Sequence, residues 1–244
     1  MKRLAYTRYE LLRTLRNRRL LVFSLGFPIA LYFLIAGPNH DKSDFAGTGL
    51  SAPLYYMVGL AAFGTMAAMI AGGSRIAGER SVGWTRQLRI TPLTTRDYFR
   101  AKVVTAYALA LLSLAALYLC GASLGVRLPA GRWLAMSGLM LVGLLPFAGL
   151  GVALGHVLNV DSIGPATGGL VSLLAFVSGV WFPITSGFLY HFGRLLPSWW
   201  LVQASHVGVG GQGWGTMGSA VVAVWTVICA VLARYAYRRD TARV

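Results

Sequence analysis

Long apolar runs separated by polar connections dominate the sequence. Six runs are each about as long as the roughly 17–25 residues that a helix needs to cross the hydrocarbon of a bilayer. They cover residues 20–36, 52–76, 103–126, 133–157, 163–182 and 214–237. This pattern predicts an all-α integral membrane protein with six transmembrane helices. An even number of crossings places both ends of the chain on the same side.

Basic residues are concentrated on alternate connections between these runs. Seven lie in residues 1–19, seven in residues 75–102 and four in residues 234–243, out of 22 in the chain. The four on the other side are Lys42, Arg127, Arg132 and Arg194. Because cytoplasmic connections carry the excess of lysine and arginine, both termini are predicted to be cytoplasmic in a multi-pass protein of the cell membrane.

The composition leaves little sequence for a soluble domain, with 56% hydrophobic and 12% charged residues in 244. We therefore predict one transmembrane domain, residues 20–237, with a short cytoplasmic tail at 238–244. The net charge of +15 is attributed to membrane topology and contact with anionic lipid. Nucleic acid is not expected as a partner, since the cations flank the spans. Cys120 and Cys229 are predicted to be unpaired packing residues.

The first 19 residues combine leucines at helical spacing with several arginines. The leucines are Leu4, Leu11, Leu12 and Leu15. This pattern predicts an amphipathic helix, residues 1–19, that lies in the cytoplasmic interface of the membrane. A solvated basic extension is the alternative.

Residues 78–102 form the only sizeable connection on the predicted cytoplasmic side. Apolar residues at helical spacing lie there among arginines, which favours a short amphipathic helix on the membrane surface that ends at Pro92. Thr95 is expected to begin the helix that follows. A docking element is favoured over a merely solvated loop. The apolar residues are Trp84, Leu88 and Ile90.

The connection at residues 183–213 is too apolar for an ordinary exposed loop. Pro197 divides it into two short pieces, and Ser198 is a candidate cap for the second. The pattern predicts a re-entrant helical hairpin buried in the outer half of the protein. The alternative is that its aromatic residues only anchor the outer interface.

Two glycine pairs at a spacing of four predict close helix packing. They are Gly151 with Gly155, and Gly164 with Gly168. In lipid, helices associate through packing, and small residues let two backbones approach closely.

Catalytic chemistry is not apparent in the predicted spans. All seven carboxylates fall in connections, helix ends or the first helix, and His156 with Asn159 has no paired glutamates beside it. We predict no catalytic, cofactor-binding or metal-binding residue. A coupled secondary carrier, which tends to need an ionisable group near the midplane, remains an alternative, as does a membrane enzyme or sensor.

A phosphate-binding loop is also missing from the sequence. Such a loop needs a Gly-Lys-Ser/Thr end, and the only lysine followed by serine or threonine, Lys42, is preceded by Asp41. If transport here uses ATP, another chain hydrolyses it.

The connection after the second run resembles the cytoplasmic loop of type-2 membrane subunits of ATP-binding-cassette (ABC) exporters, especially the drug-resistance permeases of actinobacteria. The resemblance covers nearly the whole chain, and in this loop Trp84 replaces a usual threonine. The matching positions, with Lys102 following, are Glu79, Arg80, Gly83, Trp84, Leu88, Thr91, Pro92 and Leu93. A second match, Ser178-Gly179-Val180-Trp181 continuing into the outer connection, is similar to the end of the family's fifth span. Its gate-like residues are Phe182, Pro183, Leu196 and Pro197.

The resemblance implies a permease subunit that exports hydrophobic or amphipathic compounds. Two such subunits, identical or different, would face each other above two ATPase subunits, which bind ATP and magnesium. The loop at residues 79–93 would contain the coupling helix that docks on the ATPase. The cargo, whether antibiotic, drug or lipid, is left open.

Overall fold

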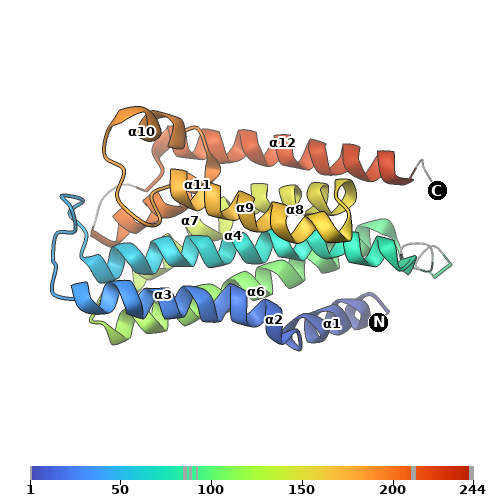
Figure 1. Cartoon of the computed structure of the whole chain (residues 1–244), viewed down its shortest axis with the longest axis horizontal. Coiled ribbons are helices and arrows are strands. Elements are labelled where there is room, and N and C mark those ends of the chain that lie inside the picture. Colours follow the sequence, from blue (N-terminus) through green and yellow to red (C-terminus); the bar gives the residue numbers. More distant parts are fainter. Residues whose placement is uncertain (1, 85–86, 88–89, 92, 210–212, 242–244) are drawn as a thin grey trace.

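The computed structural model describes residues 2–84, 87, 90–91, 93–209 and 213–241. Long helices run side by side along one axis, and both termini lie at the same end of the bundle (Figure 1). We call this end the terminal end and the other the opposite end. In order the helices are α1 Lys2–Leu15, α2 Arg18–Leu21, η1 Val22–Gly26, α3 Phe27–Ala36, η2 Gly37–Asn39, α4 Ala52–Ser81, α6 Thr95–Ser123, α7 Ala130–Gly143, α8 Leu145–Val157, α9 Val160–Val177, α10 Gly187–Gly193, α11 Pro197–Gln203, η3 Ala204–Val209 and α12 Gly215–Thr241.

The all-helical class is confirmed, and among the described residues five helical spans are long and apolar enough to cross a membrane. They are Ala52–Ser81, Arg96–Ser123, Ala130–Val157, Val160–Val177 and Gly215–Asp240. The first predicted span is interrupted by the π-helical turn Val22–Gly26, and its apolar part is the shorter helix Ser24–Asn39. Six crossings therefore stay a prediction.

Several predicted boundaries were wrong. Helix α4 continues past residue 76 to Ser81, because its last charged side chains find partners inside the bundle. Helix α9 stops at Val177, not at 182, because Gly179 adopts a positive φ of 74°, the left-handed conformation that ends many helices. Helix α12 continues through residues 238–241, which were assigned to the tail.

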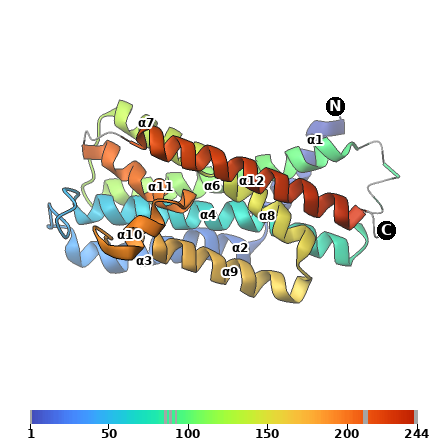
Figure 2. The same cartoon turned by 90° about the horizontal axis from the view of Figure 1, so that it is seen from above.

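Helix α4 forms the centre of the bundle. In its most apolar window 83% of the residues are buried, against 11% for α9 and 17% for α12. These two helices are therefore peripheral, and α9 runs along one edge of the bundle (Figure 2). Helices α7 and α8 together form one span, broken where Pro146 lacks the N–H that would continue the hydrogen-bond ladder.

The first glycine pair packs as predicted. A Cβ added at Gly73 of α4 would lie 2.1 Å from the carbonyl carbon of Gly151, and one at Gly155 would lie 2.3 Å from the Gly73 oxygen. Helices α4 and α8 therefore meet backbone to backbone. A Cβ added at Gly164 or Gly168 would meet nothing within 4 Å, so the second pair packs against no helix in the described part of this chain.

Both cysteines are free, as expected. Cys229 is buried and Cys120 is partly buried. Cys229 lies directly against Gly149, so its contacts are those of a packing residue.

Candidate functional site

A network of buried charges joins three helices at the terminal end. Lys102 of α6 donates through Nζ to Glu10 Oε1 of α1 at 2.6 Å and also to Glu79 Oε1 of α4. The Nη1 atom of Arg13 in α1 lies 3.3 Å from Glu79 Oε1, and the Nη1 atom of Arg75 in α4 lies 3.6 Å from Glu10 Oε1. We call these five residues the ion network.

Three members of the ion network are almost completely removed from solvent. The exposed fractions are 1% for Glu10, 3% for Glu79 and 2% for Lys102. The Tyr98 hydroxyl adds a hydrogen bond to Glu79 Oε2 at 2.5 Å. Removing one partner of such a buried pair typically destabilises a protein by about 3–5 kcal/mol, because the other charge is left without compensation. The network therefore fixes α1, α4 and α6 relative to one another.

Helix α1 ends at Leu15, before the predicted end at residue 19, and its polar side packs on the bundle. Glu10 and Thr14 are each 1% exposed, whereas Leu12 and Leu15 are 44% and 39% exposed. The leucines thus point away from the protein. Tyr6 also lies on the packed side, and burial together with the charges of Glu79 and Glu10 raises the pKa of its hydroxyl.

A second polar cluster links α4 to α8 and α12. Arg80 Nη2 lies 2.7 Å from Asp240 Oδ1, and Arg80 Nη1 donates to the Gly155 carbonyl at 3.2 Å. His156 Nδ1 lies 3.0 Å from Asp240 Oδ2. His156 therefore lies beside the ion pair between Arg80 and Asp240.

The structure places the predicted coupling residues in two different settings. Glu79 and Arg80 were assigned to a loop, but they belong to α4 and their side chains face other helices of the chain. Gly83 has a positive φ of 71° just after α4 ends. Leu88 and Pro92 lie outside the described residues, as does most of the short helix expected to end at Pro92.

The described remainder of this connection is more exposed. Ile90 is 88% and Val82 72% exposed. Leu93 donates its backbone N–H to the Thr91 hydroxyl at 3.4 Å. Helix α6 begins at Thr95, as expected. Its cap is the preceding Thr94, whose hydroxyl accepts from the Asp97 N–H at 3.2 Å.

Trp84 borders a cavity of about 570 Å³ between α1 and α4. Its wall includes residues of the ion network and residues of the connection between α4 and α6. Its lining residues are Tyr9, Arg13, Asn17, Arg75, Gly78, Glu79, Val82 and Trp84.

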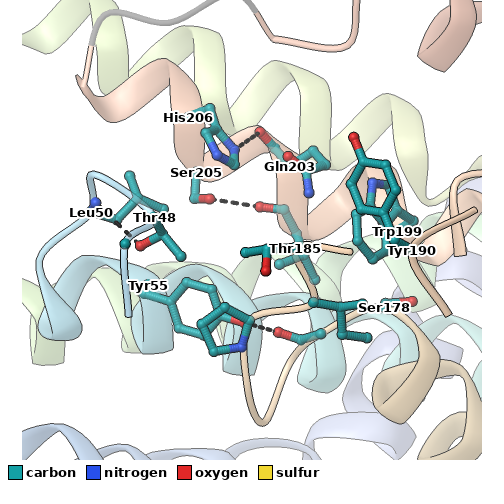
Figure 3. A pocket seen from close by; sticks show the side chains of 15 residues that line it. Thr48, Leu50, Tyr55, Ser178, Thr185, Tyr190, Trp199, Gln203, Ser205 and His206 are labelled. Carbon is teal, nitrogen blue, oxygen red and sulfur yellow. Dashed lines mark hydrogen bonds between the residues drawn. The ribbon is translucent and has the colours of Figure 1, made fainter. Parts of the chain in front are cut away.

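A second cavity, of about 270 Å³, lies at the opposite end (Figure 3). Its wall comes from the connection before α4, from Tyr55 of α4, from the end of α9 and from α10, α11 and η3. None of its described lining residues is a lysine, arginine, aspartate or glutamate. The lining residues are Gly47, Thr48, Leu50, Tyr55, Ser178, Gly179, Pro183, Ile184, Thr185, Tyr190, Trp199, Val202, Gln203, Ser205 and His206. We call it the neutral pocket.

Neutral hydrogen bonds hold the walls of this pocket. The Tyr55 hydroxyl donates to the Gly179 carbonyl, which joins α4 to the end of α9. Ser178 donates to the Ser198 hydroxyl at 2.6 Å. Ser198 therefore does not cap α11 as expected; the cap position is Leu196, which has no capping side chain.

The predicted gate residues are only partly brought together. Pro183 lines the neutral pocket and Pro197 is the buried first residue of α11. Phe182 is 40% exposed and packs edge-on against Phe176. Neither Phe182, Leu196 nor Pro197 lines the pocket.

The two short helices of this connection differ in burial. Every residue of α11 from Pro197 to Val202 is buried. In α10, by contrast, Phe188 is 79% and Phe192 41% exposed. The expected break at Pro197 is confirmed, while the re-entrant depth of the hairpin stays a prediction.

Neither the ion network nor the neutral pocket could be assembled from the sequence, because each joins segments that are far apart in the chain. Glu10 and Lys102 are separated by 92 positions, and Tyr55 and Gly179 by 124. A usable signal was the scarcity of acids: with seven carboxylates among 22 basic residues, a glutamate inside an arginine-rich helix suggests a buried ion pair.

The long apolar helices that the structure describes, packed side by side, are typical of a multi-pass membrane protein. Residues 3–208 match the model of the ABC-2 type transporter family, so the chain belongs to that family. A relative from Bacillus subtilis (strain 168), "Putative transport permease YvfS", is 31% identical over 196 residues, which cover 78% of each chain.

These matches confirm the resemblance to ABC-2 permeases. The chain is a transporter permease subunit, and its family implies partnership with an ATPase subunit.

Proposed function

We propose that this chain is the membrane subunit of an ATP-driven exporter that moves hydrophobic or amphipathic compounds out of the cell. ATP and magnesium would bind to a separate ATPase subunit. Two permease subunits, identical or different, would enclose the path of the cargo. Membership of the ABC-2 family supports this proposal. Drug-resistance export of the actinobacterial type is the specific form we favour.

The terminal end is proposed to be cytoplasmic, with the protein in the cell membrane. The charge pattern supports this orientation, since eighteen of the 22 basic residues belong to the termini and to residues 75–102. A cysteine placed at the exposed Ser81 in a chain without its two native cysteines tests it. An impermeant thiol reagent should label this cysteine only after the membrane is opened, and labelling in intact cells would contradict the orientation.

The ATPase subunit is proposed to dock on residues 79–93. The observation that supports this most is the exposure of Ile90 at 88% and Val82 at 72%, beside a helix end held rigidly by the ion network. Glu79 and Arg80 would act from inside, as positioning residues. Gly83, Trp84, Leu88, Thr91, Pro92 and Leu93 would form the coupling surface.

Rigid attachment gives this surface a way to transmit force. A push on residues 82–94 reaches α4 and α6 directly, because the segment connects them, and reaches α1 through Glu79, Lys102 and Glu10. The three helices would then move as one rigid body, and rigid-body rotation about an interface is a known type of conformational transition.

At the opposite end, the α10–α11 connection is proposed to close the outer end of the cargo path. The neutral pocket supports this, since Pro183 lines it and its described lining has no charged side chain that would disfavour the apolar part of an amphipathic compound. Phe182, Leu196 and Pro197 would move with the connection.

Binding of the cognate ATPase subunit to permease variants tests the docking proposal. Ile90→Glu should weaken binding at least tenfold, because a carboxylate replaces an apolar contact, while Ile90→Val should retain most of it. Leu195→Glu makes the same kind of change at an exposed position of the opposite end and is the matched control. Equal binding by Ile90→Glu and Leu195→Glu would refute docking at this segment.

A further inference from the structure

A groove of about 600 Å³ between α6, α8 and α12 belongs to neither site described above. Its wall is apolar and is formed largely by small side chains. The apolar lining residues are Phe99, Val103, Ala148, Gly149, Val152, Ala230, Ala233 and Tyr237. Three arginines complete the lining: Arg96, Arg234 and Arg238.

The arginines lie at one end of the groove and the apolar lining extends inward from them. Arg96 is in the first turn of α6, and Arg238 is in the last turn of α12, so both lie at the terminal end. At a rise of 1.5 Å per residue, Ala230 is about 12 Å deeper than Arg238, and Val103 is about 10 Å deeper than Arg96. The groove therefore has a cationic mouth and an apolar interior.

The lining of the groove is positively charged at its mouth. No aspartate or glutamate is among its described lining residues. Asp240 of α12 is turned to Arg80 at 2.7 Å and to His156 at 3.0 Å. Asp97 of α6 accepts a hydrogen bond from the Thr94 hydroxyl at 2.6 Å.

Interaction with the helix dipole does not explain why all three positions are arginines. Arg238, in the last turn of α12, is favoured by the helix dipole, which is negative there. Arg96 is in the first turn of α6, where the dipole is positive and a cation is disfavoured. An anionic group at the mouth would interact favourably with Arg96 and with the positive end of the α6 dipole.

We propose that this groove binds an anionic phospholipid from the leaflet next to the terminal end. The phosphate would lie among Arg96, Arg234 and Arg238, and an acyl chain would cover the small residues of α8 and α12. The charge of the mouth and the apolar depth of the interior together match a lipid better than a soluble anion, which would leave the interior unfilled. The proposal does not depend on the direction of transport or on the cargo.

Lipid binding by the purified full-length chain tests the headgroup contact. Native mass spectrometry gives the apparent affinity for phosphatidylglycerol and for phosphatidylcholine with the same acyl chains. Phosphatidylglycerol should bind more tightly. Each arginine near a membrane surface contributes about a fivefold preference for anionic lipid, so Arg96→Gln/Arg234→Gln/Arg238→Gln should lose more than tenfold.

The matched control is Arg127→Gln/Arg132→Gln/Arg194→Gln, which removes the same charge at the opposite end and should bind as the unmodified chain does. Equal affinity for the two lipids, or equal loss in the control, would overturn the proposal.

A second pair of variants tests the interior without changing charge. Ala230→Phe should fill the groove and weaken phosphatidylglycerol binding, whereas Ala223→Phe, two turns away on α12 and outside the groove, should not. Unchanged binding by Ala230→Phe would contradict occupation of the groove. Displacement of the lipid from the unmodified chain by the ATPase subunit would instead identify a protein-docking surface and overturn the lipid assignment.

Discussion

Helix α4 is held at its two ends by different chemistry. At the terminal end, Glu79 and Arg80 form buried or half-buried ion pairs with residues of α1, α6 and α12. At the opposite end, Tyr55 forms a neutral hydrogen bond to the end of α9, beside a pocket without formal charge. Between these ends the helix packs closely against α8, where Gly73 of α4 meets Gly151 and Gly155 of α8.

This difference separates a rigid end from an adaptable one. A buried charge left unpaired costs several kcal/mol, so the ion network permits few arrangements of α1, α4 and α6. A neutral hydrogen bond contributes only about 1 kcal/mol net and can be exchanged for water. This difference is what the proposed mechanism needs, in which the terminal end transmits movement and the opposite end opens and closes.

The largest effect is expected when the ion network loses its central cation. Lys102→Met should destabilise the protein by about 3–5 kcal/mol, because Glu10 and Glu79 lose the buried cation they share and keep only the more distant Arg75 and Arg13. Equilibrium unfolding in detergent measures it. Lys42→Met removes an exposed lysine and should have almost no effect; a similar loss in both variants would mean that burial of Lys102 is not what matters.

A smaller effect is expected from overpacking the middle of α4. Gly155→Val places side-chain atoms against the Gly73 carbonyl, which lies 2.3 Å from a Cβ at that position, and should cost about 1–3 kcal/mol. Gly168→Val, in the same spacing motif but with open space around it, is the control for the isolated subunit. Thermal unfolding of the two variants should differ clearly, and equal melting would contradict the close approach of α4 and α8.

At the opposite end, Tyr55→Phe should cost about 1 kcal/mol, the net value of one neutral hydrogen bond. The same unfolding assay measures this change. Tyr235→Phe, on the exposed face of α12, is its control. A loss as large as that of Lys102→Met would show that the two ends do not differ as described.

The smallest change is expected when both hydroxyls of a buried pair are removed. Ser178→Ala leaves the Ser198 hydroxyl without its partner, whereas Ser178→Ala/Ser198→Ala removes both groups and should be closer to the unmodified protein. A double-mutant cycle gives the coupling energy. Strictly additive losses would show that the two serines do not interact.

The apolar runs predicted the helices well but not where they end. The apolar character of a run is a local property of the sequence, so α4, α6, α8 and α12 could be found from it. The end of α4 at Ser81 depends on Lys102 and Arg13, and the direction in which α1 faces depends on Glu10. Such contacts join segments far apart in the chain.

The candidate sites were predictable to a similar degree. The family-like motif located Glu79 and Arg80, although their partners place them inside the bundle rather than on a docking loop. The connection at residues 37–51 showed no chemical signal, yet Thr48 and Leu50 line the neutral pocket. Only the folding of this connection against η3 and the end of α9 gives these residues their position.

Photo-crosslinking in the assembled transporter tests the central claim, that the terminal end receives the ATPase subunit, most directly. A photoreactive residue at position 90 should form a covalent product with the ATPase subunit, and one at position 195, also exposed but at the opposite end, should not. An ATPase product from position 195 and none from position 90 would contradict the account.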